Sequence, residues 1–366
     1  MKKISALLLC LVLLLCACSK PVEEPSTEAT VSTEAPTEAP TTQQTEPATE
    51  SVTEPVTEPV NLFVSPLTGL PMETEYDQLR PYAVMINNIR VAMPQCGTSN
   101  ADVIYEVLAE GGITRMMAIF SNLEGDTPLG SIRSLRPYYL SIARSYDAIV
   151  VHAGGSEQAY SDLETTGWDH IDGVRGANSG SYYYRVQARI DSAGYEHSLF
   201  INMEDAVDYA RYEDCREYHE DFPAPFTFTD APLTEGEVAE QVAVSFRSGG
   251  KETSFTYDPE TGLYTGAQYG EVWADGNDGT ELTFRNLLVL YAETKTVDDY
   301  GRLAVTLLGS GQGYYIRDGR CIPITWSRDA QDAPFRYTTQ GGEPLELGAG
   351  KTYVAITPPE SPLELG

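Results

Sequence analysis

The sequence predicts an α/β (or α+β) domain with a mixed central sheet, followed by an all-β antiparallel domain. Three observations favour this fold class. The 366 residues are 42% hydrophobic, which is enough for a sizeable core in one large or two ordinary domains. Apolar, strand-like runs alternate with helical patterns up to about residue 222. From about residue 240 onward, short strands follow one another at hairpin spacing.

Residues 1–18 have the pattern of a bacterial lipoprotein signal peptide. A short basic start precedes an apolar run over residues 5–15, which is too short to span a bilayer as a mature helix. The run leads into the sequence LCAC, which resembles a lipobox and would place the lipid on Cys18. An ordinary secretory signal cleaved nearby is the alternative. We expect lipid on Cys18 to anchor the protein to the extracytoplasmic face of the bacterial cell membrane.

Residues 19–61 consist largely of Thr, Glu, Pro, Ala and Val, with repeats such as TEP and TEAP. A segment of this composition cannot bury enough apolar surface to form a core. We therefore expect an extended tether that holds two folded domains away from the membrane. The change in sequence pattern places these domains at residues 62–222 and 223–366.

The charge of the chain argues against a nucleic-acid partner. The formal net charge is −30, and residues 1–60 contain nine of the 54 acidic and three of the 24 basic residues. The remaining 45 acidic and 21 basic residues give the rest of the chain about −24. Nucleic-acid binding requires a basic face, so we expect no nucleic-acid partner. Between Lys20 and Lys251 every permanent cation is arginine. One explanation is composition bias; the other is that this part of the chain uses guanidinium groups to recognise a carboxylate or a phosphate.

Three apolar stretches predict the strands of the first domain. Residues 80–88 are apolar almost without interruption, which indicates burial on both faces. Residues 101–120 indicate two strands joined by the sequence EGG, with a helix over 100–109 as the alternative. Residues 148–153 predict a further buried strand.

Helices are predicted between and after these strands. A helical pattern follows Pro137, which suits the first position of a helix. Residues 156–167 predict a second helix, with Ser156 as its N-cap and Gly167 as its stop. An amphipathic helix is expected at 203–214, whereas residues 168–200 are aromatic and loop-like.

The second domain shows turn chemistry at Asp258-Pro259 and Asp318-Gly319 between its short strands. We interpret the sequences GSGQG (309–313) and DGNDG (275–279) as turns, because neither has the residues of a phosphate-binding or calcium-binding loop. Trp273 and Trp326 suit either core packing or stacking on sugar rings.

Two loops at predicted strand ends form the candidate ligand site. A strand that runs into a Gly/Ser loop and then a helix presents backbone N–H groups that suit an anion. Asn87, at the end of the first strand, is included with them. The expected ligand-binding residues are Arg133, Ser134 and Arg136 in one loop, His152, Gly154 and Gly155 in the other, and Asn87.

Arg115 lies in an otherwise apolar strand, where a charge requires a partner. We expect an ion pair with Glu106 or Glu110 across the hairpin, with a direct ligand contact as the alternative. His152 suits either a hydrogen bond in the core or a general base. Ser156 lacks the context of a nucleophile and is assigned to the helix cap.

No cofactor or metal is expected, because no HxH or HExxH spacing is present. The cysteines of the mature chain, Cys96, Cys215 and Cys321, fit neither a disulfide framework nor a zinc pattern. One disulfide is compatible with their number, which would leave one free thiol.

Several of these segments resemble the YerB-like lipoprotein family, whose N- and C-terminal domains have no assigned function. The resemblance is carried by residues 80–88, 101–120, 131–143 and 150–160 and by the tail from Thr325, and it covers nearly all of residues 64–359. It implies an extracytoplasmic lipoprotein with two domains. It implies no activity.

We therefore expect a membrane-anchored extracytoplasmic lipoprotein that binds an anionic cell-envelope ligand, such as a cell-wall polymer or a polyprenyl phosphate. One alternative is an enzyme acting on a phosphate-bearing envelope glycan, with Arg115, Arg133 and Arg136 as a phosphate clamp and His152 or a carboxylate as the base. A second alternative is a scaffold that docks a partner protein through its β domain.

Overall fold

The computed structural model describes residues 63–72, 78–247 and 249–366. The signal peptide, with Cys18, and the tether at 19–61 lie outside the described residues. The described residues belong to one compact unit. Within these ranges, no helix has both the length and the hydropathy that crossing a bilayer requires.

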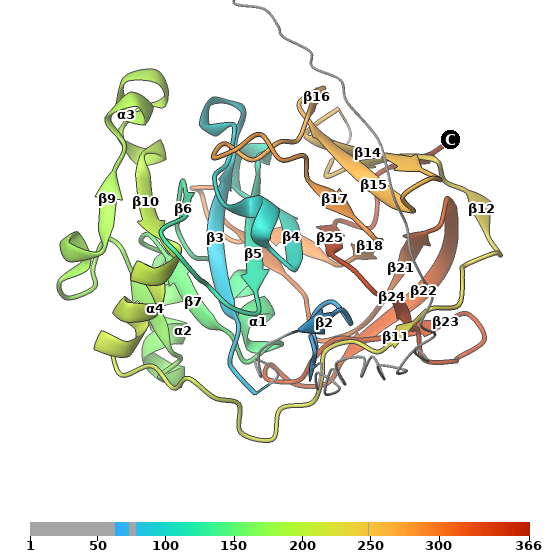
Figure 1. Ribbon diagram of the computed structural model, residues 1–366, viewed down its shortest axis with the longest axis horizontal. Coiled ribbons are helices and arrows are strands. Elements are labelled where there is room, and N and C mark those ends of the chain that lie inside the picture. The colour runs from blue at the N-terminus through green and yellow to red at the C-terminus, as the bar shows by residue number, and fades with distance from the viewer. Residues whose placement is uncertain (1–62, 73–77, 248) are drawn as a thin grey trace, which may run out of the picture. The chain divides into compact units, whose positions relative to one another are not determined.

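One mixed sheet of eleven strands runs through the protein (Figure 1). In spatial order its strands are β12 (Glu237–Val238), β22 (Arg320–Arg328), β21 (Gly309–Arg317), β18 (Asn286–Tyr291), β25 (Thr352–Thr357), β4 (Val103–Leu108), β5 (Thr114–Phe120), β3 (Tyr82–Asn88), β7 (Ile149–His152) and β8 (His170–Asp172), with β23 (Arg336–Thr339) beside β22. Strands from both predicted domains share this sheet, because β25 pairs in parallel with β4 and with β18. The boundary between residues 222 and 223 therefore stays a prediction.

A second sheet is antiparallel and contains only C-terminal strands. Its members are β16 (Glu271–Val272), β15 (Leu263–Gln268), β14 (Glu252–Asp258), β13 (Gln241–Ser245), β26 (Leu363–Leu365) and β17 (Thr283–Phe284). The smaller sheets are β6 (Pro128–Gly130) with β10 (Leu199–Asn202) and β9 (Tyr183–Arg185), β1 (Phe63–Val64) with β2 (Pro71–Met72), β11 (Phe228–Thr229) with β24 (Leu347–Gly348), and β19 (Thr294–Thr296) with β20 (Leu303–Val305). The predicted fold class is confirmed: helices and a mixed sheet come first, and mostly antiparallel strands follow.

The described residues contain four α-helices, all in the N-terminal region. They are α1 (Pro137–Arg144), α2 (Glu157–Thr166), α3 (Gln187–Ala193) and α4 (Met203–Tyr212). Ser156 accepts a hydrogen bond from the backbone of Ala159 at 3.2 Å, and Gly167 ends α2 with a φ of 60°, so both predicted caps are confirmed.

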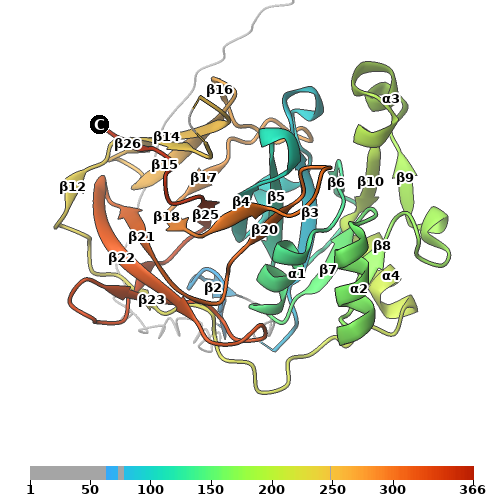
Figure 2. The ribbon, with the colours of Figure 1, turned by 180° about the vertical axis from the view of Figure 1, so that it is seen from behind.

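The long sheet is covered on both faces. One core cluster joins α1 and α2 to one face, through residues such as Tyr139, Leu163 and Met85. The other joins α4 and the second sheet to the opposite face, through residues such as Tyr209, Phe255 and Ile86. Accordingly α4 lies in front of the sheet in Figure 1, and α1 and α2 lie in front in Figure 2. All seven residues of β3 are buried, as its apolar sequence predicts.

Two predictions for local structure are wrong. Residues 168–200 are not a loop, because they contain β8, β9 and α3 as well as the start of β10. The sequence GSGQG does not form a turn, since residues 309–313 are the first half of β21. The turn lies instead at Asp318-Gly319, where both residues have positive φ.

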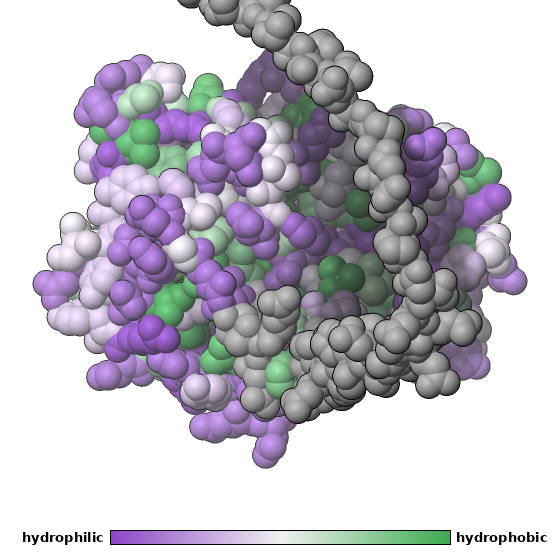
Figure 3. All heavy atoms as spheres, in the orientation of Figure 1, coloured by the Kyte–Doolittle hydropathy of each residue, from purple (hydrophilic) through white to green (hydrophobic). Residues whose placement is uncertain are grey.

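On the face drawn in Figure 3, hydrophilic residues are spread widely over the visible surface.

Candidate functional site

The two loops predicted from the sequence lie side by side at one edge of the long sheet. β3, β4 and β7 end there, and β5 begins there. Residues 131–135 connect the backbones of β3 and the segment after β7: the Arg133 N–H donates to the Met85 carbonyl at 2.9 Å, and the Leu135 N–H donates to the Gly154 carbonyl at 2.9 Å. In an open α/β sheet such a strand-end edge is the usual place for a ligand.

Glu110 holds two of the predicted arginines. Its carboxylate accepts a hydrogen bond from Arg136 Nε and lies 3.9 Å from Arg115 Nη2. Burial raises the pKa of Glu110, but the hydrogen bond and charge of Arg136, together with Arg115, lower it overall. Arg115 is 4% exposed and donates to the Ser134 carbonyl at 2.7 Å. Burial, with Arg136 nearby, lowers the pKa of Arg115 to about 10.

Of the two carboxylates expected to pair with Arg115, Glu106 does not. Side chains alternate between the faces of a strand, and Glu106 lies opposite Met116 whereas Arg115 lies opposite Val107. Glu106 is fully buried and lies 3.2 Å from Lys251 Nζ. Its two oxygens also accept hydrogen bonds from Asn88, Thr114, Thr253, Gln268 and Tyr353. Glu106 therefore belongs to a buried polar network between the N- and C-terminal regions.

Arg133 is the most accessible cation of the predicted loop. It donates to the Glu196 carbonyl at 2.8 Å and lies 3.3 Å from the Glu196 carboxylate, whose side chain is 68% exposed. Asn87 is 3% exposed and hydrogen-bonds Ser131 and His197. Asn87 is therefore positioned to support the loop and not to contact a ligand.

His152 lies in the core. It has no exposed surface; its Nδ1 lies 2.8 Å from the Gly154 carbonyl and its Nε2 lies 3.0 Å from His170 Nδ1. A carbonyl can only accept, so His152 Nδ1 donates to it, and His152 Nε2 accepts from His170. Burial lowers the pKa of His152, and burial with neighbouring His152 lowers the pKa of His170 to about 4. A general base at His152 would have no access to a substrate.

Because of these two histidines, we expect the folded protein to lose stability in acid. Their ordinary pKa is 6.5, and both pKa values are lowered in the folded protein, that of His170 to about 4, so below pH 6.5 the unfolded chain binds protons that the folded protein excludes. We expect the free energy of unfolding, measured by urea denaturation, to fall as the pH is lowered from 6.5 to 4. In the His170→Gln variant, which keeps a donor for His152 but cannot be protonated, the fall should be smaller. An unchanged pH dependence in this variant would contradict the assignment.

Around Gly154 the structure leaves a small space that a side chain would fill. A Cβ at Gly154 would lie 3.7 Å from the Ser134 hydroxyl oxygen and 3.9 Å from the Tyr160 hydroxyl oxygen. The Arg175 guanidinium lies over the Tyr160 ring, 3.7 Å from its centroid. Arg175 is exposed, and it has no ion pair among the described residues. We call Arg133, Ser134, Gly154, Gly155 and Arg175 the strand-end site.

Arg175 is the residue that sequence reasoning missed. It follows β8, which lies parallel to β7 and ends at the same edge of the sheet. Recognising HID (170–172) as a strand would have placed its following loop at the site. The third carboxylate nearby, Asp172, is 2% exposed and accepts hydrogen bonds from Gly154 N, Val174 N and the Tyr160 hydroxyl. Its charge is thus satisfied within the protein.

Residues that neighbour the strand-end site in the sequence line a cleft of about 700 Å³. It is lined by α1, α2 and the β19–β20 hairpin, and Arg136 and Ser156 are among its lining residues. Arg136 comes two positions after Ser134, and Ser156 directly follows Gly155; Ser134 and Gly155 belong to the strand-end site. The lining includes three arginines and three carboxylates, and Leu140, Leu303 and Leu307 are apolar members. The cleft is therefore amphipathic and close to neutral.

Other candidate groups are structural. Trp273 and Trp326 are 0% and 2% exposed, so of the two alternatives core packing is correct and stacking on sugar rings is not. Cys96, Cys215 and Cys321 are free and buried. Across the described ranges, no cluster of three or more His, Cys, Asp or Glu side chains has an arrangement that could hold a metal ion.

Comparison with known proteins assigns the chain to a family. Residues 67–216 match the N-terminal domain, and residues 242–354 the C-terminal domain, of the family described as "Protein of unknown function (DUF3048)". A Bacillus subtilis (strain 168) protein, provisionally named as the lipoprotein YerB, is 29% identical over 295 residues, which are 80% of this chain and 86% of the relative. The crystal structure of YerB from Bacillus subtilis matches with a TM-score of 0.72 at 27% identity and covers 82% of this chain and 99% of that one. The chain therefore belongs to the YerB-like lipoprotein family, whose two domains are the DUF3048 domains.

Proposed function

We propose that this protein is a membrane-anchored lipoprotein of the extracytoplasmic face that binds an anionic group of a cell-envelope ligand at the strand-end site. The observation that carries the proposal is the position of Arg175: it is exposed, stacked on Tyr160, and has no ion pair among the described residues of a strongly acidic protein. The Ser134 hydroxyl has no hydrogen-bond partner within the described chain, and it and the Tyr160 hydroxyl lie 3.7 Å and 3.9 Å from the Cβ position of Gly154. A guanidinium and a hydroxyl without polar partners in the described chain are the groups that a carboxylate or a phosphate binds.

The arginines of the region divide into two groups. Arg115 and Arg136 are buried against Glu110, and removing them from this carboxylate would leave a buried charge unpaired. Among the described residues Arg133 pairs only with the exposed Glu196, and such surface pairs contribute little stability. An anion can therefore replace Glu196 at Arg133 at low cost, so Arg133 and Arg175 are the ligand-binding cations.

Binding without turnover has more support than catalysis. The alternative of an enzyme acting on a phosphate-bearing envelope glycan requires a base at the ligand, and the one histidine considered for this role, His152, is completely buried. The lipobox ending at Cys18 and the tether at 19–61 support a protein that reaches into the cell wall from the membrane. The ligand would then be a phosphate-bearing wall polymer, a polyprenyl phosphate or a carboxylate of the wall peptide.

The proposal is tested with two soluble probes, an oligomer of glycerol phosphate and a disaccharide–tripeptide fragment of peptidoglycan. Binding to the full chain is measured by calorimetry for the wild type, Arg175→Gln and Arg133→Gln. We expect at least one probe to bind and each variant to weaken it about tenfold, since a charge-assisted hydrogen bond is lost.

Arg336→Gln is the matched control, because Arg336 is also exposed but lies on β23. It should bind as the wild type does, and all three variants should retain the wild-type Tm. Failure of both probes to bind would reject the proposal. The same follows if Arg175→Gln binds as tightly as Arg336→Gln does.

A further inference from the structure

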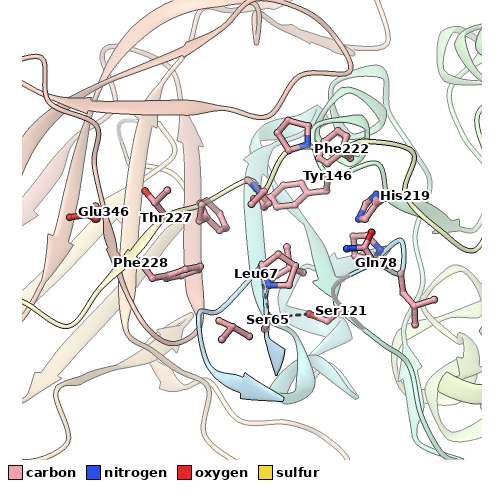
Figure 4. A pocket seen from close by; sticks show the side chains of 18 residues that line it. Ser65, Leu67, Gln78, Ser121, Tyr146, His219, Phe222, Thr227, Phe228 and Glu346 are labelled. Atoms are coloured by element: carbon pink, nitrogen blue, oxygen red, sulfur yellow. Dashed lines mark hydrogen bonds between the residues drawn. The ribbon is translucent and has the colours of Figure 1, made fainter. Parts of the chain in front are cut away.

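A second cavity, of about 660 Å³, lies where residues 64–67, residues 78–81 and the segment 222–228 meet (Figure 4). We call it the junction pocket. Its volume is in the range of small-molecule sites, and such sites commonly form where two regions of a chain join. It shares no described lining residue with the strand-end site.

Aromatic rings form much of the wall of the junction pocket. Phe226 makes edge contacts with Tyr146 and Phe228, with ring centroids 6.0 Å and 6.1 Å apart. Phe222 stacks on His219 at 5.3 Å. Figure 4 shows Tyr146 and Phe222 toward one end of the pocket and Phe228 toward the other. Several π-systems thus border one space, and their faces are electron-rich.

The lining of the junction pocket has one formal charge. Four of the lining residues are prolines, which have no backbone N–H. With histidine counted as neutral, Glu346 is the only charged residue among the described lining residues. It is exposed, and it has no ion pair or hydrogen bond among the residues that the structure describes. In Figure 4 Glu346 and His219 lie at opposite ends of the pocket.

From this combination we infer that the junction pocket binds an organic cation, in particular a quaternary or alkylated ammonium group with an apolar body. A cation over an aromatic face is attracted by the ring quadrupole, and the attraction strengthens where water is excluded. Glu346 adds a complementary charge, and the overall charge of about −24 from residue 61 onward raises the local concentration of cations. An anion would meet Glu346 and no lining arginine or lysine.

The test compares two soluble probes of the same shape, choline and 3,3-dimethyl-1-butanol, which differ in a quaternary nitrogen against a quaternary carbon. Binding to the full chain is measured by ligand-observed NMR. We expect choline to bind about tenfold more tightly, because only choline gains the cation–π and carboxylate interactions. Equal affinity for the two probes, or no binding of choline, would overturn the inference.

Two substitutions locate the site. Glu346→Gln removes the charge at an exposed position, and Phe228→Leu removes a half-buried ring at the same end of the pocket while keeping an apolar side chain. Each should weaken choline binding several-fold. Glu343→Gln is the control, because Glu343 is exposed three residues away and does not line the pocket. Choline affinity that is unchanged in Glu346→Gln, or lowered equally in Glu343→Gln, would assign the effect to general surface charge and reject the site.

Discussion

Replacing Glu106 by glutamine is expected to lower the free energy of unfolding by about 3–5 kcal/mol, because the substitution leaves a buried ammonium group without its counter-charge. The side chains of Lys251 and Glu106 are 4% and 0% exposed and lie 3.2 Å apart. Burial lowers the pKa of Lys251, and Glu106 opposes this shift. Both oxygens of Glu106 accept hydrogen bonds. In glutamine one of these oxygens is replaced by an NH2 group, which would face donors and could not accept their hydrogen bonds.

The measurement is a double-mutant cycle by urea denaturation, with Glu106→Gln, Lys251→Met and the double variant. Removing both charges relieves the unpaired ion, so the double variant should be less destabilised than the sum of the two single variants. Lys295→Met is the control, since Lys295 pairs with Glu293 at 2.9 Å with both side chains largely exposed. The control should show no measurable change. A wild-type denaturation midpoint for Glu106→Gln would contradict the structural role of the pair.

Truncating Trp273 to alanine is the second large effect that we expect, a loss of about 3–5 kcal/mol in the free energy of unfolding. Trp273 is completely buried and packs against Phe284 and Tyr353, with ring centroids 5.8 Å and 6.5 Å away. Its indole N–H donates to the Gln95 side-chain carbonyl at 2.9 Å. The truncation therefore leaves a cavity and a buried acceptor without its donor.

Denaturation of three variants separates these contributions. Trp273→Phe keeps a ring but lacks the N–H, so it should lose less stability than Trp273→Ala. Tyr300→Ala removes an aromatic side chain that is 72% exposed and should be near neutral. If Trp273→Ala proves no more destabilising than Tyr300→Ala, the second sheet does not pack on the first through this residue.

Local sequence signals predicted the elements whose partners are close in the chain or whose pattern is self-contained. The apolar run of β3, the hairpin of β4 and β5, and the capped helix α2 all follow from their own residues. β9 and β10 could not be found in this way. They have three and four residues, and β10 pairs with β6, about seventy positions earlier.

The glycines of β21 show a different limit. Glycine usually signals a turn, but in a strand it can also mark the close approach of another group. A Cβ at Gly311 would lie 2.5 Å from Trp326 Nε1, and one at Gly313 would lie 2.6 Å from the Val289 carbonyl oxygen. These residues are small because the neighbouring strands leave no room, and no local pattern contains that information.

The candidate site was predicted in part for the same reason. The neighbouring positions of the Arg133 and Gly154 loops follow from strands that end at one edge, which sequence can suggest. Arg175 was missed because β8 was interpreted as a loop. The partner of Glu106 was missed because Lys251 lies in the C-terminal region, and only the folded chain brings the two together.

β25 lies between β18 and β4 and pairs in parallel with both. The long sheet can therefore be completed only after this C-terminal strand has been synthesised. During synthesis, β4 emerges about 250 residues before the strand that covers its edge. Until residues 352–357 have been synthesised and have paired with β4, the backbone donors and acceptors along this edge of β4 have no partner strand. The residues of β4 are mostly buried in the folded protein. We therefore expect a chain that stops before residue 352 to leave this edge open and to aggregate more readily than the full chain.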